Sequence, residues 1–256
     1  MLLIDKYVGE TPLELLERIR REKPELVKEK LSYAGRLDPM AEGQMLILVG
    51  DEENKNREKV LGLDKEYLAT FLIGVKTDTG DILGLVEEDK KENVSTSSVK
   101  NGVKKEDILK KLEEIKKIKT QKYPWFSGRA VGGIKLFDHF KAGNTDIERP
   151  TRKVEIKEIE LVNFGVENSE SVKSYIFDSV SKVSGDFRQK EILNKWEKFF
   201  DAYNKNPTQN TMQTFQIKIL VSSGTFIRVL TENFDFPTTL LKLKRTKIKS
   251  DTIYKS

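Results

Sequence analysis

The first clear pattern of hydrophobic and polar residues in the chain is an amphipathic helix near the N-terminus. Residues 11–14 read Thr-Pro-Leu-Glu. This is typical of a helix start, because threonine caps the helix, proline fits its first turn and glutamate completes a capping box. Leu15, Leu16 and Ile19 then fall on one face, so we predict a helix to about Arg21.

Helical spacing recurs further along the chain. Leu109, Leu112 and Ile115 predict an amphipathic helix over 106–118. A short helix over 134–142 is predicted to end at Gly143.

Two further helices are predicted over 174–184 and 186–203. The second has Leu193, Trp196, Phe200 and Tyr203 at spacings of three and four residues. We expect Asp186 and Gln189 to cap its start and the Asn-Pro pair at 206–207 to stop it.

Strands are predicted where β-branched and aromatic residues gather. Residues 67–75 are expected to form a strand buried on both faces. Alternating patterns predict strands at 154–161 and at 215–221, the latter with its odd-numbered residues on one face. Helices and strands mix without a regular βαβ order, so we predict an α+β fold.

The pattern also predicts the domain organisation. We expect one domain over 1–256, with residues 167–212 as an inserted helical hairpin and 90–104 as a solvated loop. Lysines and arginines in the insertion would allow it to contact phosphates, but its acidic residues leave a purely packing role equally open.

Composition narrows the chemistry. The 256 residues include no cysteine and one histidine, His139. The absence of cysteine removes disulfides, zinc-thiolate sites and thiol nucleophiles, and with one histidine neither a Ser-His-Asp triad nor a His-based metal site has a spare candidate. The longest apolar run, 45–49, is too short to cross a bilayer, and the N-terminus does not resemble a secretory signal. We expect a soluble, cytoplasmic protein.

The net charge of +5 is modest, but basic residues gather at 241–256, where one acid, Asp251, accompanies six basic side chains. These are Lys242, Lys244, Arg245, Lys247, Lys249 and Lys255. Such a stretch can contact phosphates, or it can be a solvated surface strand with a frayed end. The residues leave both interpretations open.

Three polar clusters are candidates for a site. The first, 33–43, contains an Asp-Pro pair at 38–39 between glycines, which can hold a carboxylate at the edge of a cleft or simply form a local turn. The second combines 65–67 with 74–84, which alone predicts a hydrogen-bonded hairpin. The third, 222–228, is a strand that ends at a glycine and continues as a helix carrying Arg228.

Together and in this order, the clusters resemble the TruB family of tRNA pseudouridine-55 synthases. Residues 35–43, Gly-Arg-Leu-Asp-Pro-Met-Ala-Glu-Gly, are similar to the family's catalytic motif. Similar family motifs occur at 5–9, at 65–67 together with 77–84, at 224–228 and at 240–246. The resemblance covers nearly the whole chain outside 167–212, and five motifs in register make it very specific.

The resemblance implies roles for individual residues. Asp38 would be the catalytic carboxylate, Tyr67 the aromatic ring that stacks on the target base, and Arg228 the cation that pairs with Asp38. Aspartates are normally ionised at neutral pH, so such a nucleophile needs no activating base. Further substrate-binding residues would be Tyr33, Arg36, Phe226, Leu243, Lys6, Arg129, Lys242, Lys244 and Arg245.

The sequence also departs from the family pattern. Tyr33 stands where the family often has histidine, Tyr7 replaces a proline, and Arg129 stands near a family lysine. Bacterial relatives usually carry a further C-terminal RNA-binding domain, and only ten residues follow Thr246, so we expect that domain to be missing.

The resemblance implies a mixed, largely antiparallel sheet flanked by helices, of the pseudouridine synthase type. It implies isomerisation of a uridine in the T arm of tRNA, at position 55, without cofactor or metal. We expect a monomer with no obligate protein partner and no membrane association. Two rivals remain: a non-catalytic tRNA chaperone or scaffold of the same fold, and a guide-RNA-dependent synthase subunit.

Overall fold

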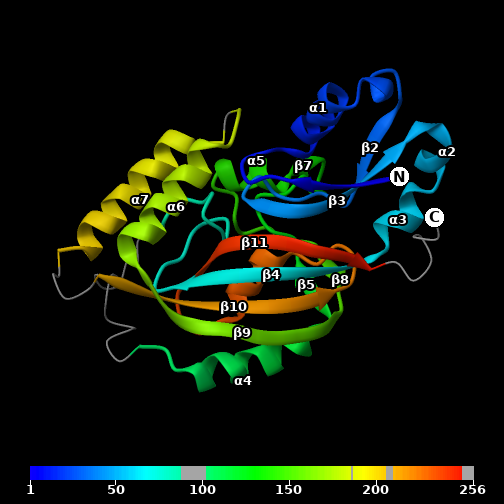
Figure 1. Ribbon diagram of the computed structural model, residues 1–256. Helices are drawn as coiled ribbons and strands as arrows, with labels where there is room; N and C mark the ends of the chain where they lie inside the picture. The colour runs from blue at the N-terminus through cyan, green and yellow to red at the C-terminus, as the bar shows by residue number, and fades with distance from the viewer. Residues whose placement is uncertain (88–101, 186, 206–209, 250–256) are drawn as a thin grey trace.

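The computed structural model describes residues 1–87, 102–185, 187–205 and 210–249, and its main feature is a seven-stranded sheet (Figure 1). The strand order is β1-β3-β11-β4-β10-β9, with β2 also paired to β3. The strands are β1 (Leu2–Lys6), β2 (Leu31–Ala34), β3 (Ala41–Val49), β4 (Asp64–Ile73), β9 (Ile156–Asn168), β10 (Thr211–Val221) and β11 (Thr238–Lys249). Only the β11–β3 pair in this sheet is parallel, so the predicted mixed, largely antiparallel α+β fold is confirmed.

Helices cover this sheet at several places in the described part of the chain. They are α1 (Pro12–Glu22), α2 (Gly50–Lys55), α3 (Arg57–Leu61), α4 (Lys105–Lys116), α5 (Leu136–Lys141), α6 (Ser169–Ser181) and α7 (Gln189–Tyr203), with 3-10 turns η1 (Pro24–Leu26) and η2 (Ile227–Asn233). Short strands pair as β5 (Thr120–Lys122) with β8 (Thr151–Lys153) and β6 (Ala130–Val131) with β7 (Ile134–Lys135). Figure 1 shows α6 and α7 side by side at one end of the sheet and α4 along β9.

The start of α1 agrees with the prediction. Thr11 is its N-cap, and the reciprocal hydrogen bonds of a capping box with Glu14 are both present. Leu15, Leu16 and Ile19 are buried. This helix end is determined locally, because each capping group lies within one turn of its partner.

The strands differ from the predictions mainly at their ends. The strand expected at 67–75 is β4, which begins at Asp64 and is buried on both faces as predicted. The strand expected at 154–161 overlaps β9, which begins later, at Ile156, and continues further, to Asn168. Phe215, Ile217, Ile219 and Val221 on β10 are all buried, as their alternation indicates.

Two helix predictions need correction. In α4 the buried residues are Ile108, Leu112 and Ile115, whereas Leu109 is 43% exposed. Ile108, Leu112 and Ile115 are separated by four and then three residues. Ile108, and not Leu109, therefore lies on the face against the sheet. The helix expected at 134–142 begins only at Leu136, because residues 134–135 form β7, and it ends before Gly143 as predicted.

Helices α6 and α7 lie between β9 and β10, where a helical hairpin was expected. α6 begins earlier than predicted, because Asn168 caps it by accepting hydrogen bonds from Glu170 and Ser171. α7 follows Arg188, and Gln189 Oε1 accepts a hydrogen bond from Phe187 N just before the helix. The predicted cap at Asp186, the stop at 206–207 and most of the predicted loop at 90–104 fall outside the described residues.

The basic stretch near the C-terminus forms β11, which lies between β3 and β4 inside the sheet. The interpretation of this stretch as a surface strand is therefore wrong for residues 241–249. Its side chains alternate, with Leu243 and Arg245 buried and Lys242 and Lys244 partly or fully exposed. The basic composition of the stretch does not reveal this alternation, which arises because successive side chains of a strand point to opposite faces.

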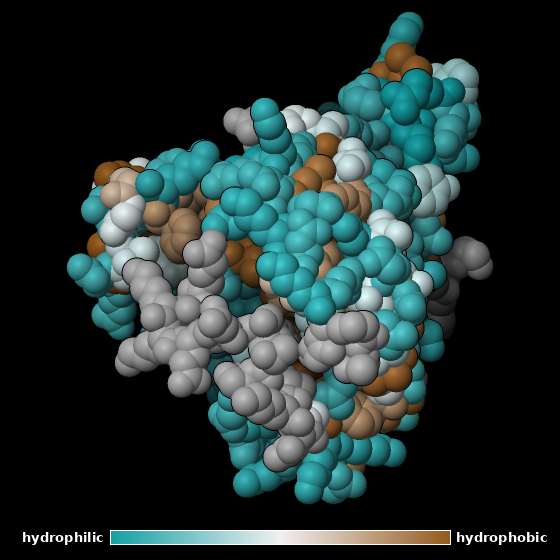
Figure 2. Space-filling view, turned by 90° about the vertical axis from the view of Figure 1, so that its left-hand side faces the viewer, coloured by the Kyte–Doolittle hydropathy of each residue, from teal (hydrophilic) through white to brown (hydrophobic). Residues whose placement is uncertain are grey.

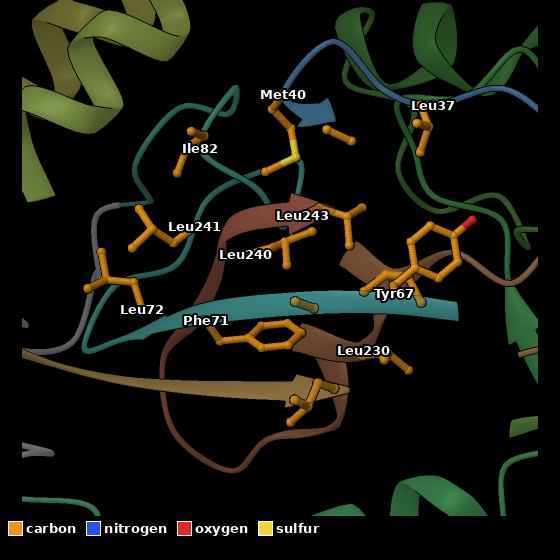
Figure 3. Close-up of a cluster of buried hydrophobic side chains, with 14 of the residues drawn as sticks. Leu37, Met40, Tyr67, Phe71, Leu72, Ile82, Leu230, Leu240, Leu241 and Leu243 are labelled. Atoms are coloured by element: carbon orange, nitrogen blue, oxygen red, sulfur yellow. The ribbon is translucent and has the colours of Figure 1, made fainter. Parts of the chain in front are cut away.

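The hydrophobic core joins the sheet to both helices of the hairpin. Phe71 of β4 stacks on Phe215 of β10 at a centroid distance of 5.0 Å. Trp196 and Phe200 of α7 are fully buried in the same cluster. Figure 3 shows Leu240, Leu241 and Leu243 of β11 together with side chains from β4 and from the loop before β3. No helix in the described ranges is long and apolar enough to cross a membrane.

Candidate active site

Asp38 lies in the loop between β2 and β3, and its side chain is 37% exposed. The backbone on either side of it is held firmly. Ala41 N donates to Asp38 O at 3.0 Å, and Gly9 N donates to Pro39 O at 2.8 Å. Gly43 (φ 102°) lies so close to the Arg245 backbone that a Cβ would collide with its carbonyl oxygen. The loop therefore presents a carboxylate at the surface on a fixed backbone.

Arg228 faces Asp38 from η2, the turn that follows β10. Its Nε lies 3.6 Å from Asp38 Oδ2, and one terminal nitrogen lies 3.4 Å from Asp81 Oδ2. The other terminal nitrogen donates to the carbonyl oxygen of Phe126 at 2.8 Å. Among the described residues Nε has no hydrogen-bond partner, so it can move toward Asp38 or toward a ligand.

The charges of this group are strongly coupled. Burial acts to lower the pKa of Arg228, but the carboxylates of Asp38 and Asp81 outweigh that effect and raise its pKa above the ordinary value. Burial raises the pKa of Asp81, and the Arg228 guanidinium opposes that rise. The guanidinium is thus a permanent cation between one buried and one accessible carboxylate.

Tyr67 lies on the apolar side of Asp38, whose charge acts on its phenol. It is 8% exposed on β4, close to Leu243 of β11 and Leu37 of the Asp38 loop (Figure 3). Burial raises the pKa of its phenol, so the ring stays neutral. The Arg245 guanidinium lies 5.7 Å from the centre of the ring. A flat base that entered beside Asp38 would meet this ring and the leucine.

Two residues expected to bind substrate are buried instead. Arg245 is 1% exposed and donates to the carbonyl oxygens of Gly35 at 3.1 Å and Arg36 at 3.3 Å. Lys6 is fully buried and donates to the carbonyl oxygens of Tyr7, Glu10 and Pro39. The prediction that they contact substrate is therefore corrected: both support the Asp38 loop from beneath.

The other predicted residues fall into three groups. Tyr33 and the exposed Arg36 lie together on the Asp38 loop side, where Arg36 donates to the Tyr33 hydroxyl at 3.2 Å. Phe226 packs edge-on against Tyr123 at 5.6 Å, and the exposed Arg129 lies 5.4 Å from the centre of the Tyr123 ring.

The third group is Lys242 and Lys244, which make no described contact with Asp38, Arg228 or Tyr67. Lys242 lies 3.7 Å from Glu167 and 4.7 Å from the centre of the Tyr175 ring of α6. Lys244 lies 3.6 Å from Glu42 on β3. On β11 these lysines alternate with Leu243 and Arg245, so they point to the opposite face of the sheet.

Sequence reasoning missed two residues that contact Arg228 and a third that contacts their neighbourhood. Asp81 was available in the motif at 77–84, and its spacing from the strand before it was the only signal. Phe126 contributes a backbone oxygen, which no residue pattern reveals. Arg188 lies 2.9 Å from Asp78 and 4.5 Å from the centre of the Phe126 ring, and nothing in the sequence connects it with either.

This arrangement can perform nucleophilic chemistry with a carboxylate. Asp38 is partly exposed, Arg228 lies 3.6 Å from it, and the largely buried Tyr67 ring lies on its apolar side. Within the described ranges no cluster of three or more His, Cys, Asp or Glu residues is arranged to hold a metal ion.

Comparison with known proteins gives consistent matches to one group. The family model "TruB family pseudouridylate synthase (N terminal domain)" matches residues 23–182. The tRNA pseudouridine synthase B of Caldicellulosiruptor saccharolyticus is 34% identical over 164 residues, which are 64% of this chain and 52% of that protein. The Bacillus subtilis protein of the same name is 33% identical over 162 residues, covering 63% and 48%. The chain thus spans about half the length of these relatives.

A solved structure shows the same fold. The crystal structure of a Cbf5-Nop10-Gar1 complex contains a chain that aligns with 96% of this chain and 48% of its own length, with a TM-score of 0.53 and 17% identity. The shared sheet supports the matched motifs, which lie on its central strands and on the loops between them. The chain belongs to the TruB family of pseudouridylate synthases.

Proposed function

We propose that this chain is a tRNA pseudouridine synthase that converts the uridine at position 55, in the T arm, with Asp38 as its nucleophile. The observation that carries the proposal is the group of Asp38, Arg228 and Tyr67, which come from three distant segments of the chain and lie near one another. Membership of the TruB family and the names of the tRNA-modifying relatives support the substrate.

Each member of the group has a defined task in this reaction. The target uracil leaves its stack in the RNA and lies against Tyr67 and Leu243, which replace the lost stacking. Arg228 holds the Asp38 carboxylate in position by its charge, and Asp81 and the Phe126 carbonyl fix Arg228 in turn.

The bond changes balance without a redox partner. Asp38 forms a transient covalent bond to the base or to the ribose, and the bond between N1 of uracil and C1′ of ribose breaks. The base rotates, a bond forms between C5 and C1′, the C5 proton is lost and N1 gains a proton. Both sites of attack by Asp38 are compatible with this sequence of events.

The proposal extends to the organisation of the protein. We take residues 1–256 as one domain, because α6 and α7 share a core with the sheet, and residues 167–212 as an addition within it. The proposed enzyme works as a cytoplasmic monomer on tRNA, with neither a guide RNA nor an obligate protein partner.

The test is to incubate the purified chain alone with an unmodified tRNA transcript and map pseudouridine by position. We expect one modified site, uridine 55, and no product when that uridine is replaced by cytidine. Tight tRNA binding without any product would identify a non-catalytic scaffold instead. Product that appears only after a guide RNA or partner proteins are added would identify a guided subunit.

A further inference from the structure

The helical hairpin of α6 and α7 packs against the turn that carries Asp78 and Asp81. Trp196 of α7 is fully buried and donates from its indole nitrogen to the Ile82 carbonyl oxygen at 3.2 Å. This face of the hairpin therefore belongs to the core. The side of the molecule on which the hairpin lies is mostly hydrophilic, with smaller hydrophobic areas among the polar ones (Figure 2).

Arg188, at the start of α7, makes the most specific contact between the hairpin and this turn. Its guanidinium lies 2.9 Å from Asp78 Oδ2 and 3.5 Å from Asp78 Oδ1, and 4.5 Å from the centre of the Phe126 ring. The two charged side chains are 19% and 10% exposed. Little water competes with this pair, so its geometry is better defined than that of a surface ion pair.

The backbone of Arg188 has a left-handed conformation, with φ of 62°. Among the described residues it is the only one other than glycine with positive φ. Such a conformation is unfavourable for a side chain of this size and persists when the surrounding contacts determine it. The contacts with Asp78 and Phe126 hold Arg188 in this conformation.

Each partner of Arg188 connects it to Arg228, one through the turn that contains Asp81 and the other through its own backbone oxygen. Asp78 begins the turn that ends at Asp81, which lies 3.4 Å from one terminal nitrogen of Arg228. Phe126 accepts a hydrogen bond from the other terminal nitrogen at 2.8 Å. Apart from Asp38 these are the groups among the described residues that hold the guanidinium. Arg188 therefore contacts one of the two supports, Phe126, and is connected to the other, Asp81, through Asp78 in the same turn.

The same end of the hairpin also touches the segment behind Asp38. The backbone of Lys182 lies so close to Gly9 (φ 89°) that a Cβ on that glycine would collide with it. Gly9 N donates to Pro39 O, directly after Asp38 in the chain. Ser184 Oγ donates to a Glu14 carboxylate oxygen on α1. Lys182, Ser184 and Arg188 thus contact segments that adjoin Asp38 on one side and Arg228 on the other.

We propose that Arg188 is a positioning residue, which acts through Asp78 and Phe126 to fix Arg228 relative to Asp38. The kinetic part of this inference rests on the proposed synthase function. In this role the hairpin aligns the reacting groups and does not serve mainly as a surface for RNA. It follows that removing the Arg188 side chain slows the chemical step and leaves tRNA binding nearly intact.

The experiment compares Arg188→Gln with Arg188→Lys, and with Arg20→Gln as the matched control. Arg20 also pairs with a carboxylate, that of Glu17 at 2.8 Å, but this pair lies on α1, and Glu17 is far more exposed than Asp78. We expect Arg188→Gln to lower kcat by about 10- to 100-fold, as small displacements of reacting groups do, with the Kd for tRNA within threefold of the parent. Arg188→Lys should recover part of kcat, because it keeps a cation beside Asp78. Arg20→Gln should match the parent in both quantities.

A kcat of Arg188→Gln within twofold of the parent would overturn the inference. So would a raised Kd with unchanged kcat, which would make Arg188 an RNA contact. A crystal structure of Arg188→Gln supplies a readout that does not need activity: we expect Arg228 to lose its hydrogen bond to the Phe126 carbonyl and to move relative to Asp38. If the parent protein makes no pseudouridine, the proposed function fails, and an unmoved Arg228 in that structure would still overturn the positioning role separately.

Discussion

Two buried arginines, Arg228 and Arg245, lie close to the Asp38 loop, and their surroundings differ sharply. Arg228 lies between the carboxylates of Asp38 and Asp81, and these raise its pKa despite its burial. Arg245 donates to the backbone oxygens of Gly35 and Arg36, and burial lowers its pKa. One guanidinium therefore balances the charge of two carboxylates, and the other braces a loop.

The difference indicates that the two arginines have different roles. A cation between carboxylates orients the reacting group, and its exact shape matters because the group it faces must be held at one angle. A cation among carbonyl oxygens stabilises a backbone path and can be changed with a smaller effect on the chemical step. The expected effects below run from the largest to the smallest.

Asp38→Asn should reduce pseudouridine formation by at least about a thousandfold, because the amide cannot act as the nucleophile. Binding of tRNA should stay within a few-fold, since one carboxylate contributes little to holding a polyanion. Single-turnover assays and filter binding on the same preparation give both numbers. Turnover near that of the parent would remove Asp38 from the mechanism and leave Arg228 without its assigned task.

Arg228→Lys should lower kcat by roughly 100-fold, since lysine keeps the charge but loses the planar fork shared by Asp81 and the Phe126 carbonyl. Arg245→Lys should cost about tenfold or less by the same reasoning, because its partners are neutral oxygens. Steady-state kinetics of the two variants compare the arginines directly. Equal losses would mean that the two sites do not differ in role.

Lys6 belongs with Arg245, since it too is held by carbonyl oxygens, and burial lowers its pKa to about 8. Above pH 8 the folded protein then binds fewer protons than the unfolded chain, so this lysine adds stability as the pH rises toward 10. Relative to Lys6→Met, the parent should gain about 2 kcal/mol in free energy of unfolding between pH 8 and pH 10.

Urea denaturation at several pH values measures this gain. The exposed Lys59→Met on α3 serves as the control and should follow the parent throughout. If the parent and Lys6→Met changed in parallel with pH, Lys6 would not be charged and buried as described.

Arg245→Met should loosen the loop that Arg245 braces. We expect amide hydrogens in peptides covering 35–43 to exchange about tenfold faster, because the carbonyl oxygens of Gly35 and Arg36 lose their donors. Peptides covering 77–86 should keep the protection of the parent. Faster exchange at 77–86 and unchanged exchange at 35–43 would reverse the assignment of the two arginines.

Replacement of Lys242, Lys244 and Lys247 by glutamine should have the smallest effect. These lysines share β11 with Arg245, but Lys242 and Lys244 already lie near Glu167 and Glu42. We expect tRNA affinity to fall only a few-fold and the salt dependence of binding to change by about one phosphate contact. A change of three contacts would place the RNA backbone along this face of the sheet.

Some of these features could be predicted from the sequence and others could not. The capped start of α1 and the alternation of β10 depend on residues one turn or two positions apart, so local patterns are sufficient. The proximity of Asp38 and Arg228 followed from the resemblance to a family, since no local pattern links them. Tyr67 and Leu243 were placed in the same way.

The roles of Lys6, Arg245 and Arg188 could not be predicted, for a common physical reason. Lysine and arginine are rarely buried, so the default expectation for a basic residue is a surface position. Backbone oxygens hold Lys6 and Arg245, and these leave no trace in the sequence. Arg188 meets Asp78 only after the hairpin has folded onto the turn, across a separation of 110 residues.

The position of β11 constrains how the protein folds during synthesis. β11 follows the other strands of this sheet in the chain, yet it lies between β3 and β4, two of the earlier strands. At usual rates of translation these strands wait with open edges for on the order of ten seconds, a period in which unpaired strands can associate wrongly. Asp38 and Tyr67 are adjacent to those edges, so we expect their surroundings to be completed only after β11 has emerged from the ribosome.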